Sequence, residues 1–192
     1  MLLESACNYL VSADDPAACD LIFVLAGRPE RKPFGLKLHA ESLAPRLILS
    51  VGRFEVRQTA QILGNVPDLL MMRDRTAPQQ RHFWLDFHDD RPAIFTVKLK
   101  RPSTFWELQA LANHLGPKPP DNIAIVSTSI HLRRVRFCCS RIPFFKNRRV
   151  YLLPVPEGQS GFQRKGWWRR FDHWFYLVSE YVKLAGYRVL YR

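Results

Sequence analysis

Three short apolar runs constrain the fold of this chain most. They are "DLIFVLAG" (Asp20–Gly27), "RLILSVG" (Arg46–Gly52) and "NIAIVSTS" (Asn122–Ser129). Each is a nearly continuous apolar stretch followed by glycine or hydroxyl residues, which is typical of a strand buried on both faces of a sheet. Segments with helical spacing follow them, so the sequence predicts an α/β fold with a mostly parallel sheet and helices on both faces.

Two further strand-forming segments and a long helix complete the expected fold. In "RHFWLDFHDDRPAIFTVKLK", apolar and polar residues alternate on either side of a turn, which predicts an inserted antiparallel hairpin, half exposed. "RRVYLLPVP" predicts a last strand, and an aromatic and basic helix begins at about Trp167. We expect a single Rossmann-like α/β domain over residues 1–192, with its core at about 20–156 and its C-terminal helix at about 167–192.

Polar and glycine residues collect where the predicted parallel strands end. Ligands of such sheets bind in the crevice beyond the carboxyl ends of the strands, so these residues are the candidate site. A helix start that follows the hairpin is expected to join them. The candidate ligand-binding residues are Gly27, Arg28, Ser50, Gly52, Arg53, Ser103, Thr104, Ser127, Thr128, Ser129 and Arg134.

The helix predicted after the third run opens with a histidine and three arginines. His131 precedes Arg133, Arg134 and Arg136, although the positive end of the helix dipole disfavours cations in a first turn. An anion bound at this helix start would make the arginines favourable, because Arg binds phosphate or carboxylate bidentately. The spacing places His131 and Arg134 on one face, toward the crevice, and the other two arginines toward solvent. The alternative is a solvated basic face on which His131 is a capping residue.

The strong positive charge narrows the class of partner. Twenty-nine Lys and Arg against 17 Asp and Glu give a net charge of +12, which favours an anionic partner. The basic residues are spread along the chain and form no nucleic-acid-binding motif, so nucleic acid is the least favoured of the three anionic partners. The other two are a phosphorylated small molecule and an anionic membrane surface.

The quoted segments resemble the YdcF-like family, which includes SanA and ElyC. The resemblance runs from about residue 20 to 156 and rests on the strand before Gly27, on "LAPRLILSVG", and on Ser127-Thr128, two residues, His131, two residues, Arg134. Single glycines stand where the family usually carries Gly-Gly, and no Asn follows Glu107. The resemblance implies a Rossmann-like sheet, an anion-binding crevice, nucleotide-like ligands and a link to bacterial envelope metabolism. The sequence leaves the cofactor open, with a nucleotide or S-adenosylmethionine as the candidates to test.

The sharpest chemical hypothesis is a hydrolase or transferase acting on a phosphorylated substrate. His131 would be the general acid or base, because its ordinary pKa lies near neutrality. Glu55 or Glu107 would orient it or activate water, although Glu107 also fits a capping box that begins at Thr104, the interpretation we favour for it. The chain has no G-x-x-x-x-G-K-[ST], G-x-G-x-x-G or G-x-S-x-G motif, so the sequence leaves open whether the site is catalytic at all.

No metal is predicted. His82, Asp86, His88 and Asp90 share one parity of the hairpin and could hold a metal, but a solvated strand face explains them more simply. The four cysteines, Cys7, Cys19, Cys138 and Cys139, show no metal or secreted-disulfide spacing, so we expect reduced, buried thiols.

The C-terminal segment supports a second, non-enzymatic hypothesis. Trp167, Trp168 and Trp174 mix with Arg169 and Arg170, as in helices that lie at a membrane interface. The same segment has the apolar spacing of a helix packed on a core, the interpretation that we favour. The N-terminus is not that of a signal peptide and no apolar window could cross a bilayer, so we expect a cytoplasmic protein, with a peripheral site at the inner membrane face as the alternative.

Overall fold

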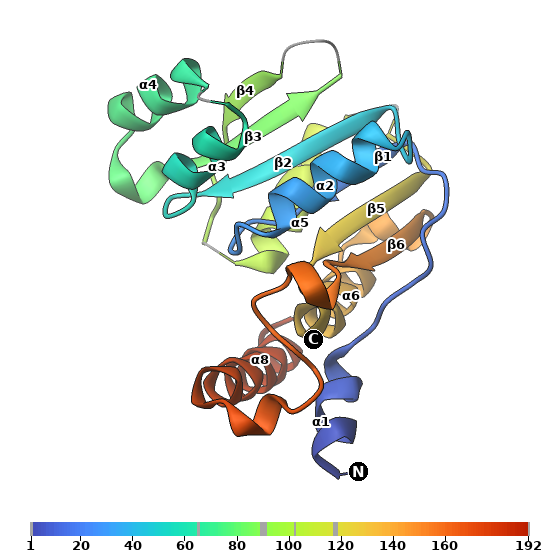
Figure 1. The fold of residues 1–192 in the computed structure, drawn as a ribbon. Coiled ribbons are helices and arrows are strands. Elements are labelled where there is room, and N and C mark those ends of the chain that lie inside the picture. Colours follow the sequence, from blue (N-terminus) through green and yellow to red (C-terminus); the bar gives the residue numbers. More distant parts are fainter. Residues whose placement is uncertain (1, 65, 89–91, 102, 117–118, 192) are drawn as a thin grey trace.

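The computed structural model describes residues 2–64, 66–88, 92–101, 103–116 and 119–191. Within them, one six-stranded sheet lies between layers of helices (Figure 1). Its strand order is β4-β3-β2-β1-β5-β6. The strands are β1 (Leu21–Val24), β2 (Arg46–Gly52), β3 (His82–Phe87), β4 (Ala93–Thr96), β5 (Asn122–Ser127) and β6 (Arg149–Pro154).

The centre of the sheet is parallel. Leu21 of β1 pairs with Arg46 of β2 on one side and with Ile123 of β5 on the other, and β6 continues the parallel pairing beyond β5. β3 runs antiparallel to β2, and β4 runs antiparallel to β3. The predicted Rossmann-like α/β sheet with an inserted antiparallel hairpin is therefore confirmed.

Helices cover both faces of the sheet and close a buried apolar cluster on each. The helices on one face supply Leu38, Val56 and Leu69 to its cluster, and those on the other supply Leu108 and Val135. The first face carries α2 (Arg31–Ala40), α3 (Val56–Ile62) and α4 (Pro67–Arg75), and the second carries α5 (Thr104–His114), α6 (Leu132–Arg141) and α7 (Pro143–Lys146).

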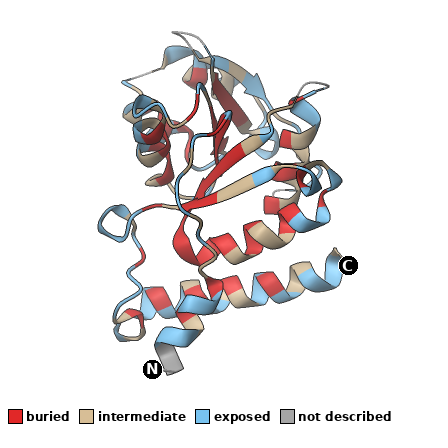
Figure 2. Ribbon diagram, turned by 90° about the vertical axis from the view of Figure 1, so that its right-hand side faces the viewer, coloured by how far each residue is buried: buried red, intermediate tan, exposed pale blue. Residues whose placement is uncertain are grey.

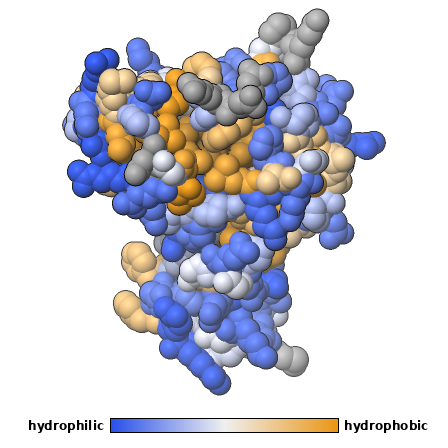
Figure 3. Space-filling view, turned by 45° about the horizontal axis from the view of Figure 1, so that its top comes forward, coloured by the Kyte–Doolittle hydropathy of each residue, from blue (hydrophilic) through white to orange (hydrophobic). Residues whose placement is uncertain are grey.

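Helix α2 packs closely on the sheet because it carries a glycine at the contact. A Cβ on Gly35 would lie 2.3 Å from Cγ2 of Val24 in β1. Only a residue without a side chain lets the helix approach the strand at this point. Figure 3 shows a broad apolar area between polar margins on the upper part of the molecule. Partly buried residues that pack against the first cluster include Leu36, Leu63 and Leu70.

Beyond α6 lies a further layer formed by the two ends of the chain, α1 (Leu2–Leu10) and α8 (Phe171–Leu190) (Figures 1 and 2). Leu10, Ile130, Trp167, Leu177 and Leu184 belong to its buried cluster. α8 therefore packs on the body of the protein through one face, the arrangement favoured from the sequence; α1 was not predicted. None of the helices in the described part of the chain is both long enough and apolar enough to cross a bilayer.

The prediction of a half-exposed hairpin is wrong for β3 and fits only β4. Trp84 is fully buried and Asp86 nearly so, because β3 lies inside the sheet with β4 as the edge strand. Asp86 binds Arg46 of β2 through two hydrogen bonds of 2.9 and 2.5 Å. The residues of the predicted turn at 89–91 lie outside the described part.

Candidate functional site

The carboxyl ends of β1 and β5 form the switch point of the sheet. The chain passes from β1 to β2 on one side and from β5 to β6 on the other, so the crevice of this fold opens between the ends of β1 and β5. Val24 and Val126 are the last paired residues there. Gly27 follows β1 and Thr128 follows β5, so the structure brings together the candidate residues expected after the first and third apolar runs.

Gly27 is exposed at this edge and adopts a φ of 113°, in the region that favours glycine. Its N–H donates to Oε1 of Glu55, and the neighbouring N–H of Ala26 donates to Oε1 of Glu107 at 2.8 Å. Two carboxylates of the chain thus occupy the backbone donors that an anionic ligand would be expected to use at this strand end.

Glu55 also forms a buried ion pair with Lys32. Its Oε2 contacts Nζ of Lys32, a side chain with no exposed surface, whose ammonium also lies 3.4 Å from the carbonyl oxygen of Leu25. Burial lowers the pKa of Lys32, and the negative charge of Glu55 opposes that shift. The pair fixes the start of α2 against the loop after β2.

Glu107 does not complete a capping box, so that prediction is wrong. The helix cap is Ser103, whose Oγ accepts from the N–H of Trp106 at 3.5 Å, and Thr104 is the first helical residue. Because the cap is Ser103 and not Thr104, Glu107 lies one position beyond that of a capping box, and its carboxylate reaches Ala26 after β1. Its role is therefore to hold the β1 end against α5.

Arg31 joins the two sides of the switch point. Its Nη1 donates to the carbonyl of Ala26, and its Nη2 donates to Oγ1 of Thr128 at 3.0 Å. The side chain is 3% exposed, and its Nε has no hydrogen-bond partner in the structure. Both acceptors are neutral, and no carboxylate of the described residues pairs with this guanidinium.

His131 is buried between two hydroxyls. Nδ1 lies 2.6 Å from Oγ of Ser127, and Nε2 lies 3.1 Å from Oγ1 of Thr104. Burial, together with the positive charges of Arg134, Arg31 and Lys183, holds its pKa well below the usual value of 6.5. The imidazole is therefore neutral near pH 7, which suits a hydrogen-bonding or basic role and disfavours a general acid.

Arg134 shares a face with His131, as expected, but its main partner is a carboxylate of α8. Nη1 donates to Thr104 Oγ1 at 2.6 Å, the same hydroxyl that His131 contacts. Nε and Nη2 donate to Glu180, whose side chain is 3% exposed. The arginine is thus committed to a buried ion pair between α6 and α8.

The other two arginines of this helix keep part of their surface in solvent, as expected, and each also binds the N-terminal segment. Nε of Arg133 donates to the backbone oxygen of Tyr9 in α1 at 2.7 Å. Arg136 donates to Ser12 and pairs with Asp14 at 2.7 Å. Together with Arg134, these side chains attach the layer of α1 and α8 to α6, which explains cations at a helix start without a bound anion.

Of the candidate residues at the end of β2, Ser50 is buried, Gly52 is partly exposed and Arg53 is exposed. Ser50 has no exposed surface, and its Oγ lies 2.9 Å from Nε2 of His82 and accepts from Nε1 of Trp84 at 3.1 Å. Gly52 leaves room for Glu55, because a Cβ there would lie 3.1 Å from the carboxylate. Arg53 is exposed and stacks on the Phe54 ring at 4.3 Å.

Helix α8 covers one side of the crevice. The hydroxyl of Tyr176 lies 2.9 Å from Oγ1 of Thr128, and the guanidinium of Arg28 stacks on the Tyr176 ring at 4.4 Å. Thr128 and Ser129 are consequently buried. The candidate residues that stay partly or fully exposed, which we call the crevice mouth, are Gly27 and Arg28 after β1 and Gly52 and Arg53 at the end of β2; a Cβ on Gly52 would lie 3.6 Å from that of Ala26.

The described residues hold no cluster of three metal-ligating side chains. Asp90 of the hairpin lies outside them, and His82 and Asp86 are engaged with Ser50 and Arg46 rather than solvated, contrary to the expectation of a solvated face. All four thiols are free and buried, and burial raises the pKa of Cys138 to about 12.

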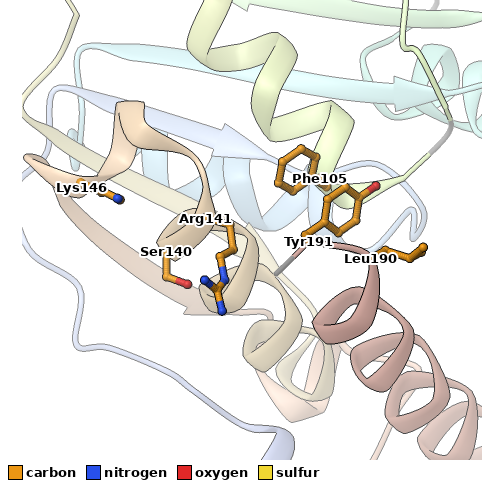
Figure 4. Close-up of a pocket in the computed structure, with 6 residues that line it drawn as sticks. All are labelled: Phe105, Ser140, Arg141, Lys146, Leu190 and Tyr191. Atoms are coloured by element: carbon orange, nitrogen blue, oxygen red, sulfur yellow. The ribbon is translucent and has the colours of Figure 1, made fainter.

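A pocket of about 370 Å³ lies away from the predicted residues, among α5, α6, α7 and the end of α8 (Figure 4). Phe105 and Tyr191 stack at 3.9 Å along one side, and Arg141 and Lys146 supply positive charge. No candidate site residue lines it.

Two charged residues near the switch point, Lys32 and Glu180, were not predicted from the sequence, and neither was the anchoring role of Arg31. The signal for Lys32 and Arg31 was present in "GRPERK", a dense charged run directly after the first strand.

Comparison of the chain with protein-family models, with curated proteins and with solved structures found no match.

Proposed function

We propose that this protein binds an anionic ligand, phosphorylated or nucleotide-like, at the crevice mouth beyond the ends of β1 and β2. Arg28 and Arg53 offer guanidinium groups that stack on rings and form no ion pair within the described residues, and Gly27, whose N–H is already bound by Glu55, leaves the surface beside them free of a side chain. Arginine in this state binds phosphate or carboxylate bidentately.

The observation that carries the proposal is the state of Arg31. Buried charges in proteins are normally paired, because an unpaired charge out of water is costly. Arg31 is buried at the switch point, contacts only the neutral Ala26 carbonyl and Thr128 hydroxyl, and keeps an unsatisfied Nε. A ligand anion would supply the missing counter-charge.

The surrounding charges support the same proposal. Three carboxylates lie close to the mouth: Glu55 accepts from the Gly27 N–H and pairs with Lys32, Glu107 accepts from the Ala26 N–H, and Glu30 accepts from the Gly161 N–H beside Arg28. The four cations at the same strand ends, Arg28, Arg31, Lys32 and Arg53, outnumber these carboxylates. An anion that approaches Arg28 and Arg53 meets a net positive surface.

Binding is the part of the hydrolase or transferase hypothesis that the geometry supports best. The three candidate catalytic groups, His131, Glu55 and Glu107, are all engaged in hydrogen bonds that hold the strand ends together. We assign them positioning roles around the mouth. A link to envelope metabolism rests on the resemblance to the YdcF-like family.

A thermal-shift screen tests the proposal. Nucleotides, S-adenosylmethionine, sugar phosphates and polyprenyl phosphates would be added to the wild type, to an Arg28→Gln/Arg53→Gln variant and to Arg31→Gln. Arg149→Gln is the matched control, since Arg149 is exposed at the opposite, amino edge of the sheet. At about 100 times its Kd, a ligand adds about 2.7 kcal/mol, or several degrees.

We expect a shift in the wild type and the control that is lost in the other variants. A wild type that no compound stabilises would refute the proposal. A shift that persists without Arg28, Arg53 and Arg31 would place the ligand elsewhere, the pocket of Figure 4 being the next place to examine.

A further inference from the structure

Helix α8 has two apolar faces, and only one of them packs on the protein. Leu177 and Leu184 point into the cluster shared with α1, together with the buried polar residues His173 and Glu180. On the opposite side lies a second row of apolar residues, exposed to solvent. This outer stripe consists of Phe171, Phe175, Val178, Val182 and Val189.

The outer stripe is far more exposed than apolar side chains of a packed helix. Phe171 is 88% exposed and Phe175 73%, and Val182 and Val189 are each 66% exposed. Their spacing of four, three, four and seven residues keeps them in one line along the helix. Scattered exposed apolar residues need no explanation, but a continuous line of them marks an interaction surface.

The charged residues of α8 avoid this line. At about 100° per residue, Asp172, Lys183 and Arg188 lie about 100° or more around the helix from the stripe, and Glu180 lies on the buried side. The stripe is therefore an uninterrupted apolar surface. Apolar groups that project from the flank of the molecule where α8 lies are visible in Figure 3.

The surroundings of the stripe are positively charged. Between residues 163 and 190 the chain has six Lys and Arg against two acidic residues. Asp172 pairs with Arg170, Glu180 pairs with both Arg134 and Lys183, and Arg164 pairs with Glu157 just before this range. Arg169 and Lys165, just before the helix, are exposed and form no ion pair among the described residues.

We propose that the outer stripe docks on an anionic lipid surface, with α8 lying in the plane of the membrane interface. An apolar line flanked by cations is the pattern of such helices, and anionic lipid complements the flanking charge. A second copy of the chain would instead bring equal positive charge against Arg169 and Lys165. Charge complementarity thus selects the lipid.

The placement of α8 fits this orientation. The helix lies on the outside of the molecule, with α6 between it and the sheet (Figure 2). Its inner face holds Tyr176 against Thr128 and Glu180 against Arg134, so the helix is fixed to the body and presents the stripe as a rigid edge. The inference is independent of whether the crevice mouth binds a ligand.

Vesicle co-sedimentation tests the inference. The full chain would be mixed at low salt with vesicles of phosphatidylcholine plus phosphatidylglycerol, and with vesicles of phosphatidylcholine alone. The variant Phe175→Gln/Val182→Gln removes apolar surface without changing charge. Phe54→Gln is the matched control, because Phe54 is 85% exposed but lies outside α8. Circular dichroism verifies that each variant is folded.

We expect the wild type and Phe54→Gln to bind anionic vesicles, with the affinity falling as salt is added. The double variant is expected to bind at least about tenfold more weakly, because the burial of even one aromatic or aliphatic side chain strengthens binding by about tenfold. Arg169→Gln/Lys165→Gln should weaken binding, and Arg149→Gln should not. Lipid with brominated acyl chains should quench the tryptophan fluorescence of the wild type more than that of Trp174→Phe, because Trp174 is a partly exposed tryptophan of α8.

Three results would overturn the inference. The first is a wild type that does not bind anionic vesicles at low salt. The second is binding that the stripe variant retains in full. The third is a wild-type dimer in sedimentation velocity that Phe175→Gln/Val182→Gln converts to a monomer, without vesicle binding, which would assign the stripe to a second copy of the chain.

Discussion

Arg134 and Glu180 join α6 to the C-terminal helix through a buried bidentate ion pair. Nε of the arginine donates to Oε2 of the glutamate at 3.0 Å, and Nη2 donates to Oε1 at 3.1 Å. Both side chains are at most 10% exposed. Since Arg134 also donates to Thr104, this pair ties three helices together beside the switch point.

The first prediction concerns this pair. Glu180→Gln should lower the free energy of unfolding by about 3–5 kcal/mol, because it leaves the Arg134 guanidinium buried without a counter-charge. Urea unfolding at pH 7 measures the change. Glu157→Gln is the control, since Glu157 forms an exposed ion pair with Arg164 whose loss should cost at most about 1 kcal/mol.

A variant in which both Arg134 and Glu180 are replaced by apolar residues distinguishes the effect of an unpaired buried charge from the effect of lost packing. Arg134→Met/Glu180→Leu should be clearly more stable than Glu180→Gln, because no unpaired charge remains. If Glu180→Gln is as stable as the wild type, the buried Arg134–Glu180 ion pair does not hold α8 in solution.

The second prediction compares two helical glycines. Gly35→Ala should destabilise the protein by about 1–3 kcal/mol, because the new Cβ would meet Val24 at 2.3 Å. Gly186→Ala in α8 should stabilise it by about 0.5–1 kcal/mol, since nothing lies within 4 Å of its Cβ position and Ala is the better helix former. Thermal unfolding of both variants checks the opposite signs; equal effects would argue against the close contact of α2 with β1.

The third prediction concerns the hydroxyl that His131 and Arg134 share. Thr104→Val keeps the shape of the side chain but removes Oγ1, which accepts from Arg134 and contacts Nε2 of His131. It should cost about 1–3 kcal/mol, because buried polar groups lose a partner. Thr104→Ser retains the hydroxyl and should lose less. The free energy of unfolding of the two variants, measured side by side, decides; a serine variant no better than valine would show that the methyl group matters instead.

The sequence predicted the buried parallel strands well, because each is a nearly continuous apolar run, as expected of a strand that is covered on both faces. It was less informative about β3, since the alternation of apolar and polar residues suggested a half-exposed strand. The polar side chains of β3 instead bind residues that are distant in the sequence; Asp86, for example, accepts from Arg46, which lies 40 residues earlier in the chain. Such pairings cannot be derived from local periodicity.

The candidate site shows the same limit. Spacing placed His131 and Arg134 on one face, where they meet at Thr104. It could not show that the negative charge near Arg134 comes from Glu180, 46 residues further along the chain. A basic helix start predicts a nearby anion, and here that anion is part of the protein.

The last prediction concerns acid stability. Burial and nearby cations hold the pKa of His131 well below its usual value, so the folded protein keeps this imidazole neutral while the unfolded chain binds a proton below about pH 6.5. The unfolded state then carries more protons, and the free energy of unfolding falls as the pH falls. For one histidine the slope reaches about 1.4 kcal/mol per pH unit. Burial also lowers the pKa of His82, which adds a contribution of the same sign.

Urea unfolding between about pH 7 and pH 5 measures this slope. His131→Asn should be less stable at pH 7, because the ring contacts are lost, but should show a shallower decline toward pH 5. His88→Asn, at an exposed position, should retain the wild-type decline. An unchanged slope in His131→Asn would mean that His131 is protonated to the same extent in the folded and unfolded states, contrary to its buried position between Ser127 and Thr104.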